Sequence, residues 1–526
     1  MARPVMRSLA TLASDWQPII GIEVHAQIKS RTKLFSDSFT DLHAGPNISP
    51  SDRVSLFDAS FPGTLPCFNK KCLDLAVRTA IALGASIQMK SSFDRKHYFY
   101  PDLPSGYQIT QKYSPIAKGG ILQLAGNPAK VVRIQQIQLE QDTAKSTTPV
   151  HSEVTRVDLS RAGIALMEIV SEPDMRSPEE AAAYVRALQA VLRAVGASDG
   201  NMELGSMRCD VNISLSRQGE PFGTRCEIKN LNTVRGLIVA LSEWSSGWGT
   251  ASVDIVIDAE IVRHRSLLEQ GLAVLQETRG FNEDTAETFR LRSKEDAPDY
   301  RYMPDPNLPP LIINQDYIDD IRSTMPTLPA QTRHRLITTY NLSPRDADVL
   351  MGIDAGSDIG FDGEPPSRLG AVAYFESVVR SGQGRDPKIV ANWLLHELIG
   401  QLSFRGQAFA DNPLSPERLG ELVDAVGAHV VTGTSGKLLM RHLIETKSDQ
   451  SLERIIDELG LRAASSTSEL ATLCRTAISM LPKESELVSK GNDKVLMKVV
   501  GQVMRLSKGT ADAQAAREEL LRQLRK

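Results

Sequence analysis

The sequence is poor in cysteine and has no long apolar segment, and each absence narrows the class of protein. Only five of its 526 residues are cysteines, and they are scattered along the chain (Cys67, Cys72, Cys209, Cys226 and Cys474). An odd number of dispersed cysteines is typical of a reducing compartment with free thiols. No apolar run reaches the ~18 residues that a membrane-spanning helix needs, so no transmembrane segment is expected.

Common nucleotide-binding loops are also missing. The segment Gly433–Lys437, GTSGK, lacks the first glycine of a Walker A loop at the required spacing, and Leu438 replaces its Ser or Thr. The sequence contains no G-x-G-x-x-G and no C-x-x-C, and the spacing of Cys67 and Cys72 is only a weak zinc signal. Internal repeats are absent too. Any ATP site must therefore be built from other elements, such as the face of a sheet.

Composition and charge are those of an ordinary soluble globular protein. Hydrophobic residues make up 41% of the chain and charged residues 24%. The length is too great for one core and predicts about three domains. A net charge of −4 excludes a globally basic nucleic-acid binder, although it allows a local basic patch.

The segment Ile19–Lys29, IIGIEVHAQIK, alternates apolar and polar residues and predicts a half-buried strand. Its polar face would present Glu23 and His25 two residues apart. Such a pair suits a metal or phosphate platform. Because charged residues mostly lie on the surface, an ordinary solvated face is the more common explanation for this stretch alone.

Further segments also have one apolar and one polar face. Residues 137–142 place Gln138, Glu140 and Asp142 on one side, and residues 166–172 bury Glu168 in an apolar run. A buried carboxylate is costly unless it is paired or binds a cation, and an ion pair with Arg161 is the competing explanation. Residues 210–216 and 224–232 alternate in the same way. Together these strands predict a largely antiparallel sheet lying over helices, with a concave polar site.

The segment Ser91–Gln111 gathers basic and aromatic residues beside a turn at Pro104-Ser105-Gly106. Arg95, Lys96 and the aromatic residues that follow could hold phosphates and stack a base. A buried aromatic corner with its cations at the surface explains the same pattern.

Helices are expected over Asn69–Ala85 and after Ser177, where Pro178 and Glu180 complete a capping pattern. Further along, residues 253–258, VDIVID, suggest a strand, and residues 260–279 suggest a helix. The proline-rich segment Asp296–Leu311 is the strongest boundary signal.

Beyond this boundary the pattern becomes helical, over residues 330–339, 344–351 and 389–398, with a loop at 352–366 and a second linker candidate at 413–416. The last 40 residues carry nine Lys or Arg and four Asp or Glu. This basic excess suits contact with an RNA backbone, and an ordinary solvated helical face explains it equally well.

Six sequence segments, taken together in their order and spacing, indicate a specific protein family. The chain resembles GatB, one of the subunits of the Glu-tRNA(Gln) amidotransferases, from about Ile19 to the C-terminus. The blocks are GIEVHAQIKSRTKLFS, FDRKHYFYPDLPSGYQITQ, DLSRAGIALMEIVSEPDMRSPEEA, MELGSMRCDVNISL, GTRCEIKNLN and YRYMPDPNLPPL.

The resemblance implies an α+β fold with an N-terminal catalytic cradle domain, residues 16–310. It further implies an all-α helical domain, residues 311–412, and a small helical tail like the YqeY proteins, residues 413–526, that contacts tRNA. Residues 1–15, which contain arginine and serine but no acid before Asp15, would be a short transit peptide or a disordered terminus. With the family, this leader suggests the mitochondrial matrix.

The resemblance also implies a reaction. ATP would phosphorylate the γ-carboxylate of Glu on Glu-tRNA(Gln), and ammonia from a separate GatA-type amidase would displace the phosphate. A small GatC-type subunit would join the two. Catalysis would rest on Mg²⁺ and cations, since phosphoryl transfer depends on positioning and electrostatics.

Family motifs assign roles to ten residues. The metal and catalytic residues would be Glu23, His25, Glu140 and Glu168. The nucleotide phosphates and water would be held by Lys96, Tyr98, Asp210 and Asn212, with Glu227 and Lys229 as weaker candidates.

The chain departs from its relatives at a few positions. Gln141 stands where many relatives have Glu, and Ser160 where they often have Asn. The zinc cysteines that some members carry near residues 35–60 are absent, so no zinc is expected. If the acid missing at Gln141 matters, metal binding is weakened. A tRNA-binding scaffold that has lost catalysis is therefore the alternative hypothesis.

Overall fold

The computed structural model describes residues 15–40, 53–124, 130–148, 154–231, 253–282, 287–293, 300–354, 359–364, 369–382, 384–448, 450–463, 467–489, 495–507 and 509–524. The expected leader, apart from Asp15, and the first residues of the proline-rich boundary segment lie outside these ranges. The chain forms two compact units, Met1–Pro329 with Asp358–Pro366 and Ala330–Ser357 with Ser367–Lys526.

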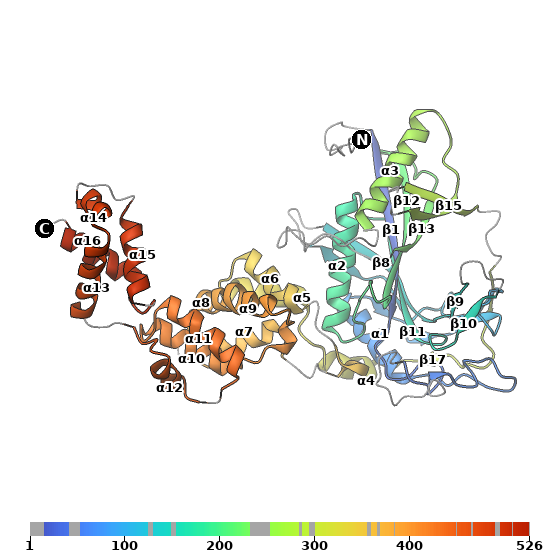
Figure 1. Cartoon of the computed structure of the whole chain (residues 1–526). Helices are drawn as coiled ribbons and strands as arrows, with labels where there is room; N and C mark the ends of the chain where they lie inside the picture. Colours follow the sequence, from blue (N-terminus) through green and yellow to red (C-terminus); the bar gives the residue numbers. More distant parts are fainter. Residues whose placement is uncertain are drawn as a thin grey trace. The chain divides into compact units, whose positions relative to one another are not determined.

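A ten-stranded sheet organises the first unit (Figure 1), and its strand order is β15-β14-β13-β12-β1-β11-β8-β6-β2, with β7 also paired to β8. Among the named pairs only β13 and β14 run parallel, which confirms the predicted largely antiparallel sheet. The central strands are β1 (Trp16–Gln27), β11 (Ala165–Ser171), β8 (Lys130–Gln141), β12 (Met207–Arg217) and β13 (Cys226–Leu231). The outer strands are β14 (Glu277–Asn282), β15 (Glu287–Ser293), β6 (Ala117–Lys118), β2 (Ser86–Ile87) and β7 (Ile121–Leu124).

Three helices cover the apolar face of this sheet (Figure 1). They are α1 (Lys70–Ala82), α2 (Pro178–Ala194) and α3 (Val253–Glu269). Alternate residues of β1, including Ile22 and Val24, are fully buried against them. The predicted cap at Ser177 is present, since its side chain accepts from Glu180 N, and the side chain of Asn69 also caps α1 by accepting from Lys71 N. The polar residues of β1 consequently face the other side.

A smaller sheet of three antiparallel strands lies beside this polar face. It consists of β16 (Arg301–Pro304), β4 (Asp94–His97) and β5 (Tyr107–Thr110), in that order. Gln108 of β5 donates from Nε2 to Glu140 Oε1 at 2.8 Å, which ties it to the large sheet. Two further strand pairs complete the unit: β9 (Lys145–Thr147) with β10 (Arg156–Asp158), and β3 (Lys90–Ser91) with β17 (Leu311–Ile312).

The strand predicted at residues 253–258 and the helix predicted at 260–279 were wrong in detail. One helix, α3, begins at Val253 and ends at Glu269, and residues 277–282 form β14. A strand would turn Val256 and Ile257 to opposite faces, yet both are fully buried together with Glu260. Positions i, i+1 and i+4 share one helical face, so this short apolar run satisfies helical spacing as well as alternation.

The second unit is helical, as predicted. One hydrophobic cluster runs from Leu336 to Leu461 and includes Leu414, and a separate cluster runs from Cys474 to Leu520. The division of the chain at residues 310 and 412 stays a prediction. The helices that close on the first cluster are α5 (Pro329–Thr338), α6 (Pro344–Asp354), α7 (Ala371–Arg380), α8 (Pro387–Asn392), the π-helical η3 (Trp393–Leu398), α9 (Ile399–Phe404), α10 (Pro416–Gly427), α11 (Gly433–Thr446) and α12 (Leu452–Glu458).

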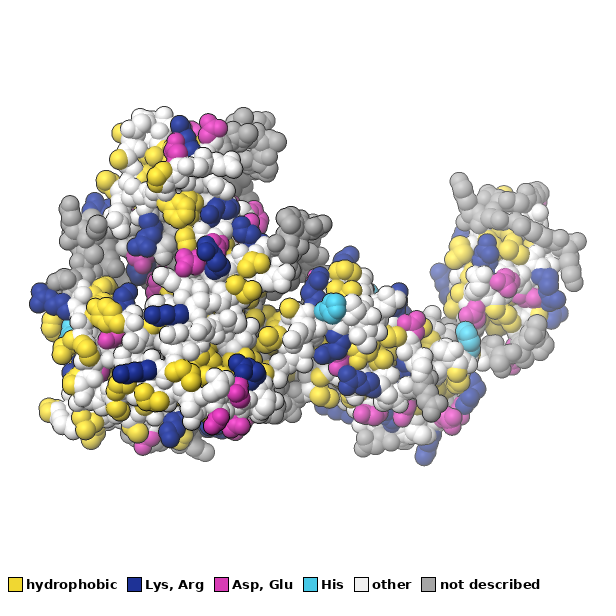
Figure 2. Space-filling model, turned by 180° about the vertical axis from the view of Figure 1, so that it is seen from behind, with side chains coloured by type: hydrophobic (Ala, Val, Ile, Leu, Met, Phe, Trp, Pro, Cys, Tyr) yellow, Lys and Arg dark blue, Asp and Glu magenta, His cyan; other side chains and the backbone are white. Residues whose placement is uncertain are grey.

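Four helices form the last part of the chain, namely α13 (Thr467–Met480), α14 (Pro482–Ser489), α15 (Leu496–Leu506) and α16 (Ala513–Leu524). The short helix α4 (Gln315–Ser323) belongs to the first unit. On the face seen in Figure 2, basic and acidic side chains are interspersed over both units, in keeping with the small net charge. Within the described ranges no helix is both long and apolar enough to cross a membrane.

Candidate functional site

The strand register gathers the predicted residues on one face of the large sheet. His25 of β1 lies directly opposite Glu168 of β11, and Glu23 lies opposite Asp210 of β12. Directly paired residues of neighbouring strands point to the same face, as do residues two apart in one strand. Glu140 of β8 is two residues from Gln138, the partner of Glu168, and therefore joins this face. Residues distant in sequence thus converge on one surface.

Three of these side chains come close enough to share one ion. Single ligand atoms of Glu23, His25 and Glu168 all lie within 4.8 Å of one another. His25 Nε2 is 3.5 Å from Glu23 Oε1, and both side chains keep partial access to solvent. We call Glu23, His25 and Glu168 the carboxylate–histidine trio.

Glu168 is the buried member of the trio, with a residue exposure of 8%. Its carboxylate accepts a short hydrogen bond from Gln138 Nε2. The predicted alternative partner, Arg161, instead donates to the carbonyl oxygens of residues 143 and 144. Burial, together with the negative charges of Glu140 and Glu23, raises the pKa of Glu168 well above its ordinary value. Burial and these neighbouring charges therefore disfavour the ionised form of Glu168, which a bound cation would favour.

Glu140 lies next to the trio but has a different partner. Although burial opposes ionisation, the charges of Lys96 and His25 hold the pKa of Glu140 below its ordinary value. Burial likewise opposes the charge of Lys96, yet Glu140 raises the pKa of that ammonium above its ordinary value. The opposite charges of the two groups therefore stabilise each other. The place of Glu140 among the metal ligands stays a prediction.

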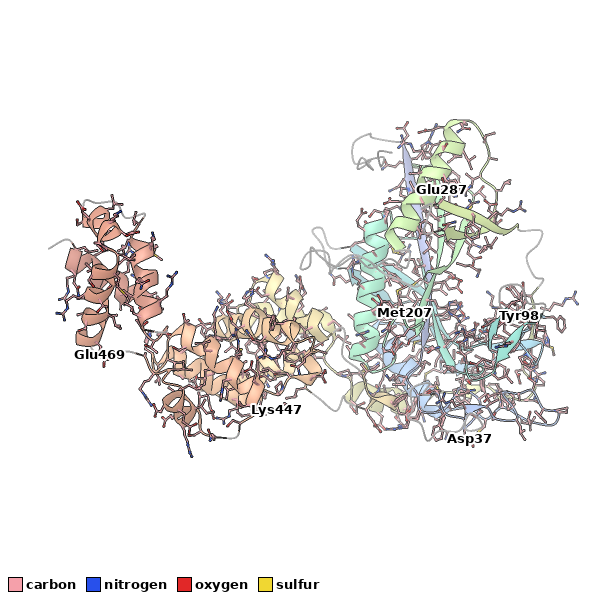
Figure 3. The ribbon with its side chains drawn as sticks, in the orientation of Figure 1. Asp37, Tyr98, Met207, Glu287, Lys447 and Glu469 are labelled. Atoms are coloured by element: carbon pink, nitrogen blue, oxygen red, sulfur yellow. The ribbon has the colours of Figure 1, made fainter. Side chains whose placement is uncertain are left out.

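Aromatic rings surround Lys96, which the cross-strand register places opposite Tyr302. Its Nζ lies 4.8 Å from the ring centre of Tyr300 and 5.8 Å from that of Tyr98. Such contacts with the faces of aromatic rings stabilise a cation. Burial raises the pKa of the Tyr98 hydroxyl above its ordinary value, and this hydroxyl donates to Gln108 Oε1 at 3.1 Å. Figure 3 shows Tyr98 across the large sheet from α2.

A second cation lies on the opposite flank of the trio. Lys229 Nζ of β13 is 3.0 Å from Asp210 Oδ2 and 3.1 Å from Glu227 Oε1. Burial opposes its charge, but Asp210 and Glu227 raise the pKa of Lys229 above its ordinary value. Asn212 is paired in register with Glu227 and Gly21 and therefore shares this face. All ten predicted residues thus lie on or beside the polar face.

Sequence reasoning missed several polar residues at this site. Gln108 and Gln138 hold Glu140 and Glu168 by direct hydrogen bonds. Arg208, opposite His25 in register, donates to Asp142 Oδ1 at 3.1 Å. Amide and guanidinium side chains are common on protein surfaces, so their residue types alone do not indicate a site. Their place at this site is visible only once the strands are paired.

The structure shows the surroundings of two departures from the family pattern, Gln141 and the missing zinc cysteines. The Oε1 of Gln141 accepts a hydrogen bond from Ile109 N at 3.4 Å, and its side chain alternates in β8 with that of Glu140. Near residues 35–60, where zinc cysteines are missing, the described part contains a buried ion pair of 3.1 Å between Lys33 and Asp58. Residues 41–52 lie outside the described ranges, and the absence of zinc stays a prediction.

The donor set of the trio fits a divalent cation. Two carboxylates suit Mg²⁺, which prefers oxygen ligands and keeps several waters, and His25 can ligate directly or hold such a water. The like charges that raise the pKa of Glu168 are the arrangement that a bound cation would offset. The trio, flanked by Lys96 and Lys229, is thus suited to holding a metal–phosphate group.

Comparison with known proteins shows the family of the chain. Residues 18–319 match the family described as GatB/GatE catalytic domain, and residues 373–524 match the one described as GatB domain. The chain is 52% identical to the mitochondrial glutamyl-tRNA(Gln) amidotransferase B-type subunit of Laccaria bicolor, over 96% of this chain and 92% of that one. Identity is 44% with the protein of the same name from Cryptococcus neoformans, over 96% and 93% of the two chains.

The chain is also similar to a bacterial protein. The aspartyl/glutamyl-tRNA(Asn/Gln) amidotransferase B-type subunit of Zymomonas mobilis is 42% identical, over 97% of both chains. The likeness therefore covers nearly the whole chain, including the site strands and the helical unit. With its α+β architecture and its six sequence blocks, this chain belongs to the GatB family of tRNA-dependent amidotransferase subunits.

Proposed function

We propose that this chain is the subunit that activates Glu-tRNA(Gln) for amidation in a heteromeric amidotransferase. In this reaction the γ-carboxylate of the esterified Glu attacks the γ-phosphorus of ATP, and ADP leaves. Ammonia then attacks the acyl phosphate, inorganic phosphate leaves, and Gln-tRNA(Gln) results. The overall activity is that of a carbon–nitrogen ligase that uses glutamine as its nitrogen donor.

The observation that carries the proposal is the carboxylate–histidine trio with a lysine on each flank. A carboxylate is a poor electrophile, and phosphorylation gives it a good leaving group. The transferring phosphoryl group carries charge on its oxygens, so the protein has to supply cations and accurate placement rather than a nucleophile. Lys229 is held 3.0 Å from Asp210, and the charge of the buried Glu140 stabilises the ammonium of Lys96.

Each predicted residue has a role in this scheme. Glu23, His25 and Glu168, with Glu140 as the fourth predicted ligand, would hold Mg²⁺, which when bound would neutralise the phosphate oxygens. Lys96 would contact the transferring phosphoryl group, and Tyr98 would fix Lys96 and Gln108. Asp210, Asn212, Glu227 and Lys229 would order the nucleotide phosphates and their water.

The proposed partners rest on the family resemblance, and the proposed location rests on the relatives' names. The chain would work with a GatA-type amidase, which releases ammonia from glutamine, and with a GatC-type or equivalent small subunit. Two relatives are named as mitochondrial proteins. We therefore place this chain in mitochondrial translation, in the matrix. The helical tail, residues 413–526, would contact the tRNA.

ATP hydrolysis that depends on Glu-tRNA(Gln), measured with the reconstituted complex, tests this function. The wild-type complex should hydrolyse ATP only when the charged tRNA is present, and Glu23→Ala should abolish both hydrolysis and Gln-tRNA formation. A complex that keeps full Gln-tRNA formation with Glu23→Ala would instead support a scaffold. The scaffold hypothesis rests on Gln141, whose side chain is engaged by β5.

A further inference from the structure

An arginine of β12 lies beside the carboxylate–histidine trio and has no role in the scheme above. Arg208 is directly opposite His25 in the strand register, so its side chain starts on the polar face next to a member of the trio. Its Nη2 donates to Asp142 Oδ1 at 3.1 Å, just beyond the end of β8. Strands β1 and β11 lie between β12 and β8 in the sheet. The side chain therefore extends over the two strands that carry the trio.

Arg208 also brings a positive charge within electrostatic reach of the neighbouring carboxylates. Burial opposes the ionisation of Glu140, but nearby cations lower its pKa below the ordinary value, and Arg208 is one of these cations. Lys229 is more fully paired, since it lies within 3.1 Å of two carboxylates, whereas Arg208 contacts one. Arg208 is thus a third cation at the polar face, in addition to Lys96 and Lys229.

A second arginine beside the same aspartate provides a comparison. Arg161 Nε is 3.7 Å from Asp142 Oδ2, and its side chain is as exposed as that of Arg208, at 29% against 30%. Arg161, however, donates to two backbone carbonyls, those of Thr143 at 3.0 Å and Ala144 at 2.7 Å. Among the described residues, Asp142 is the only one to which Arg208 donates. Because a guanidinium has several N–H donors, Arg208 keeps most of them for a bound group.

The chemistry of the proposed reaction calls for such a cation. The nucleophile is the γ-carboxylate, which is itself an anion, and it attacks a phosphorus whose oxygens are also negatively charged. A guanidinium matches paired carboxylate or phosphate oxygens with parallel hydrogen bonds and stays charged at physiological pH. In other phosphoryl-transfer enzymes an arginine that contacts the transferring group raises the rate by roughly 10³–10⁵-fold.

We propose that Arg208 is a further catalytic residue, which donates hydrogen bonds to the phosphoryl oxygens as this group passes from ATP to the γ-carboxylate. The proposal rests on the function proposed above and on the trio as the metal site. In this step the bond from the carboxylate oxygen to phosphorus forms while the bond from phosphorus to the ADP oxygen breaks. Arg208 gives up no proton, and its charge offsets the repulsion between the two anions. Asp142 holds the guanidinium in place.

The test measures Glu-tRNA-dependent ATP hydrolysis by the reconstituted complex with Arg208→Ala, Arg208→Lys and, as a matched control, Arg161→Ala. Arg208→Ala should lower kcat at least about 100-fold and leave the KM values for ATP and Glu-tRNA(Gln) nearly unchanged, because the contact is made in the transition state. Arg208→Lys keeps a cation beside Asp142 and should still lose about tenfold or more, because an ammonium cannot form the paired hydrogen bonds. Arg161→Ala should keep kcat within a few-fold of wild type.

A rescue arm separates a catalytic contact from a structural one. Guanidinium ion, added at concentrations that leave the wild-type complex folded, should raise the rate of Arg208→Ala about tenfold, because the free ion supplies the same planar donors. Urea, which is neutral and similar in shape, should not raise it. Neither compound should raise the rate of Arg161→Ala.

Several results would overturn the proposal. They are a wild-type kcat in Arg208→Lys, an equal loss of kcat in Arg161→Ala, a loss confined to KM, and no recovery of Arg208→Ala with guanidinium. If Arg208→Ala fails to assemble, the kcat of Arg208→Lys decides, since this variant keeps the charge beside Asp142. Absence of Glu-tRNA-dependent ATP hydrolysis in the wild-type complex would instead contradict the proposed function.

Discussion

A histidine lies close to a carboxylate on each side of the large sheet, but the surroundings of these two side-chain groups differ. On the polar face lies the carboxylate–histidine trio. On the helix-covered face, Cys226, Glu260 and His264 also bring single ligand atoms within 4.8 Å of one another. Cys226 and Glu227 are neighbours in β13 and point to opposite faces, one toward each group.

Arginines surround the helix-side carboxylate. Arg263 donates to Glu260 from Nε at 3.0 Å, and Arg279 Nε lies 3.4 Å from the same carboxylate. Thr288 donates to it as well, at 2.6 Å. Burial opposes its ionisation, but these groups and His264 keep the pKa of Glu260 far below its ordinary value. Its charge is satisfied by the protein itself.

The comparison shows that ligand types and distances alone do not define a metal site. Both groups meet the same distance criterion, yet the pKa of Glu168 is raised by burial and like charges while that of Glu260 is lowered by its partners. Uncompensated negative charge is what a divalent cation would offset, whereas arginines close to a carboxylate repel one. We therefore propose the trio as the metal site and a structural role for Glu260.

The largest expected effect separates the two carboxylates by activity. Glu168→Gln should lower Glu-tRNA-dependent ATP hydrolysis at least about 100-fold, because it removes an electrostatic contact made in the transition state. Glu260→Gln should keep a rate within a few-fold of wild type in the folded fraction. Steady-state ATP hydrolysis by the two complexes measures this, and equal losses in both variants would erase the distinction.

The same two variants should rank in the opposite order for stability, with Glu260→Gln losing more than Glu168→Gln. Glu260→Gln removes one of the two buried carboxylates that pair with Arg263 and Arg279, the other being Glu277, and should destabilise the first unit by less than the roughly 3 kcal/mol of a fully unpaired buried charge. Glu168→Gln removes repulsion from Glu140 and Glu23, so stability should stay the same or rise. Hydrogen exchange of α3 and β14 in both variants reports the difference. Faster exchange in Glu168→Gln than in Glu260→Gln would refute it.

Low pH should destabilise the region around α3 through protonation of Glu260. Its pKa is lowered in the folded protein, so the ion pairs contribute fully above the unfolded carboxyl pKa of about 4.3 and are lost as pH falls toward the folded value. Protection of α3 should therefore decline below about pH 4.3 in the wild type. In Glu260→Gln the same decline should be shallower, and an equally steep one would assign the acid sensitivity to other groups.

The smallest effect is expected at Gln141. Its Oε1 accepts from the backbone of β5, and its side chain alternates with that of Glu140. Gln141→Glu should therefore change kcat by less than about threefold, since the added charge is not directed at the trio. A gain of tenfold or more would show that the second acid matters and would favour the weakened scaffold.

The sequence anticipated most of the first unit because alternation there is strict. Strand β1 buries every second residue from Ile22 to Ala26, and the N-cap of α2 carries its expected hydrogen bond. The error at residues 253–258 arose where a short apolar run satisfies two periodicities at once. Only tertiary packing decides whether such a run forms a helix or a strand. Here Val256 and Ile257 are both buried in the core, as a helix allows.

The sequence named the candidate site residues and grouped four of them as metal ligands, but it could not give their individual contacts. Glu23, His25 and Glu168 were recognised from their blocks, and the register brings them together. That Glu140 and Lys96 stabilise each other's charge, and that Gln138 bonds to Glu168, depends on the proximity of side chains from strands far apart in sequence. No local pattern encodes such contacts, so they required the folded structure.

Direct measurement of metal binding tests the central claim, that the trio holds a divalent cation while the Glu260 group does not. Mn²⁺ can replace Mg²⁺ as the probe, and electron paramagnetic resonance can count the ions bound by the complex. The account predicts that Glu23→Gln combined with Glu168→Gln removes one bound Mn²⁺ per complex, whereas Glu260→Gln removes none. An unchanged count in the double variant, or a loss in Glu260→Gln, would contradict it.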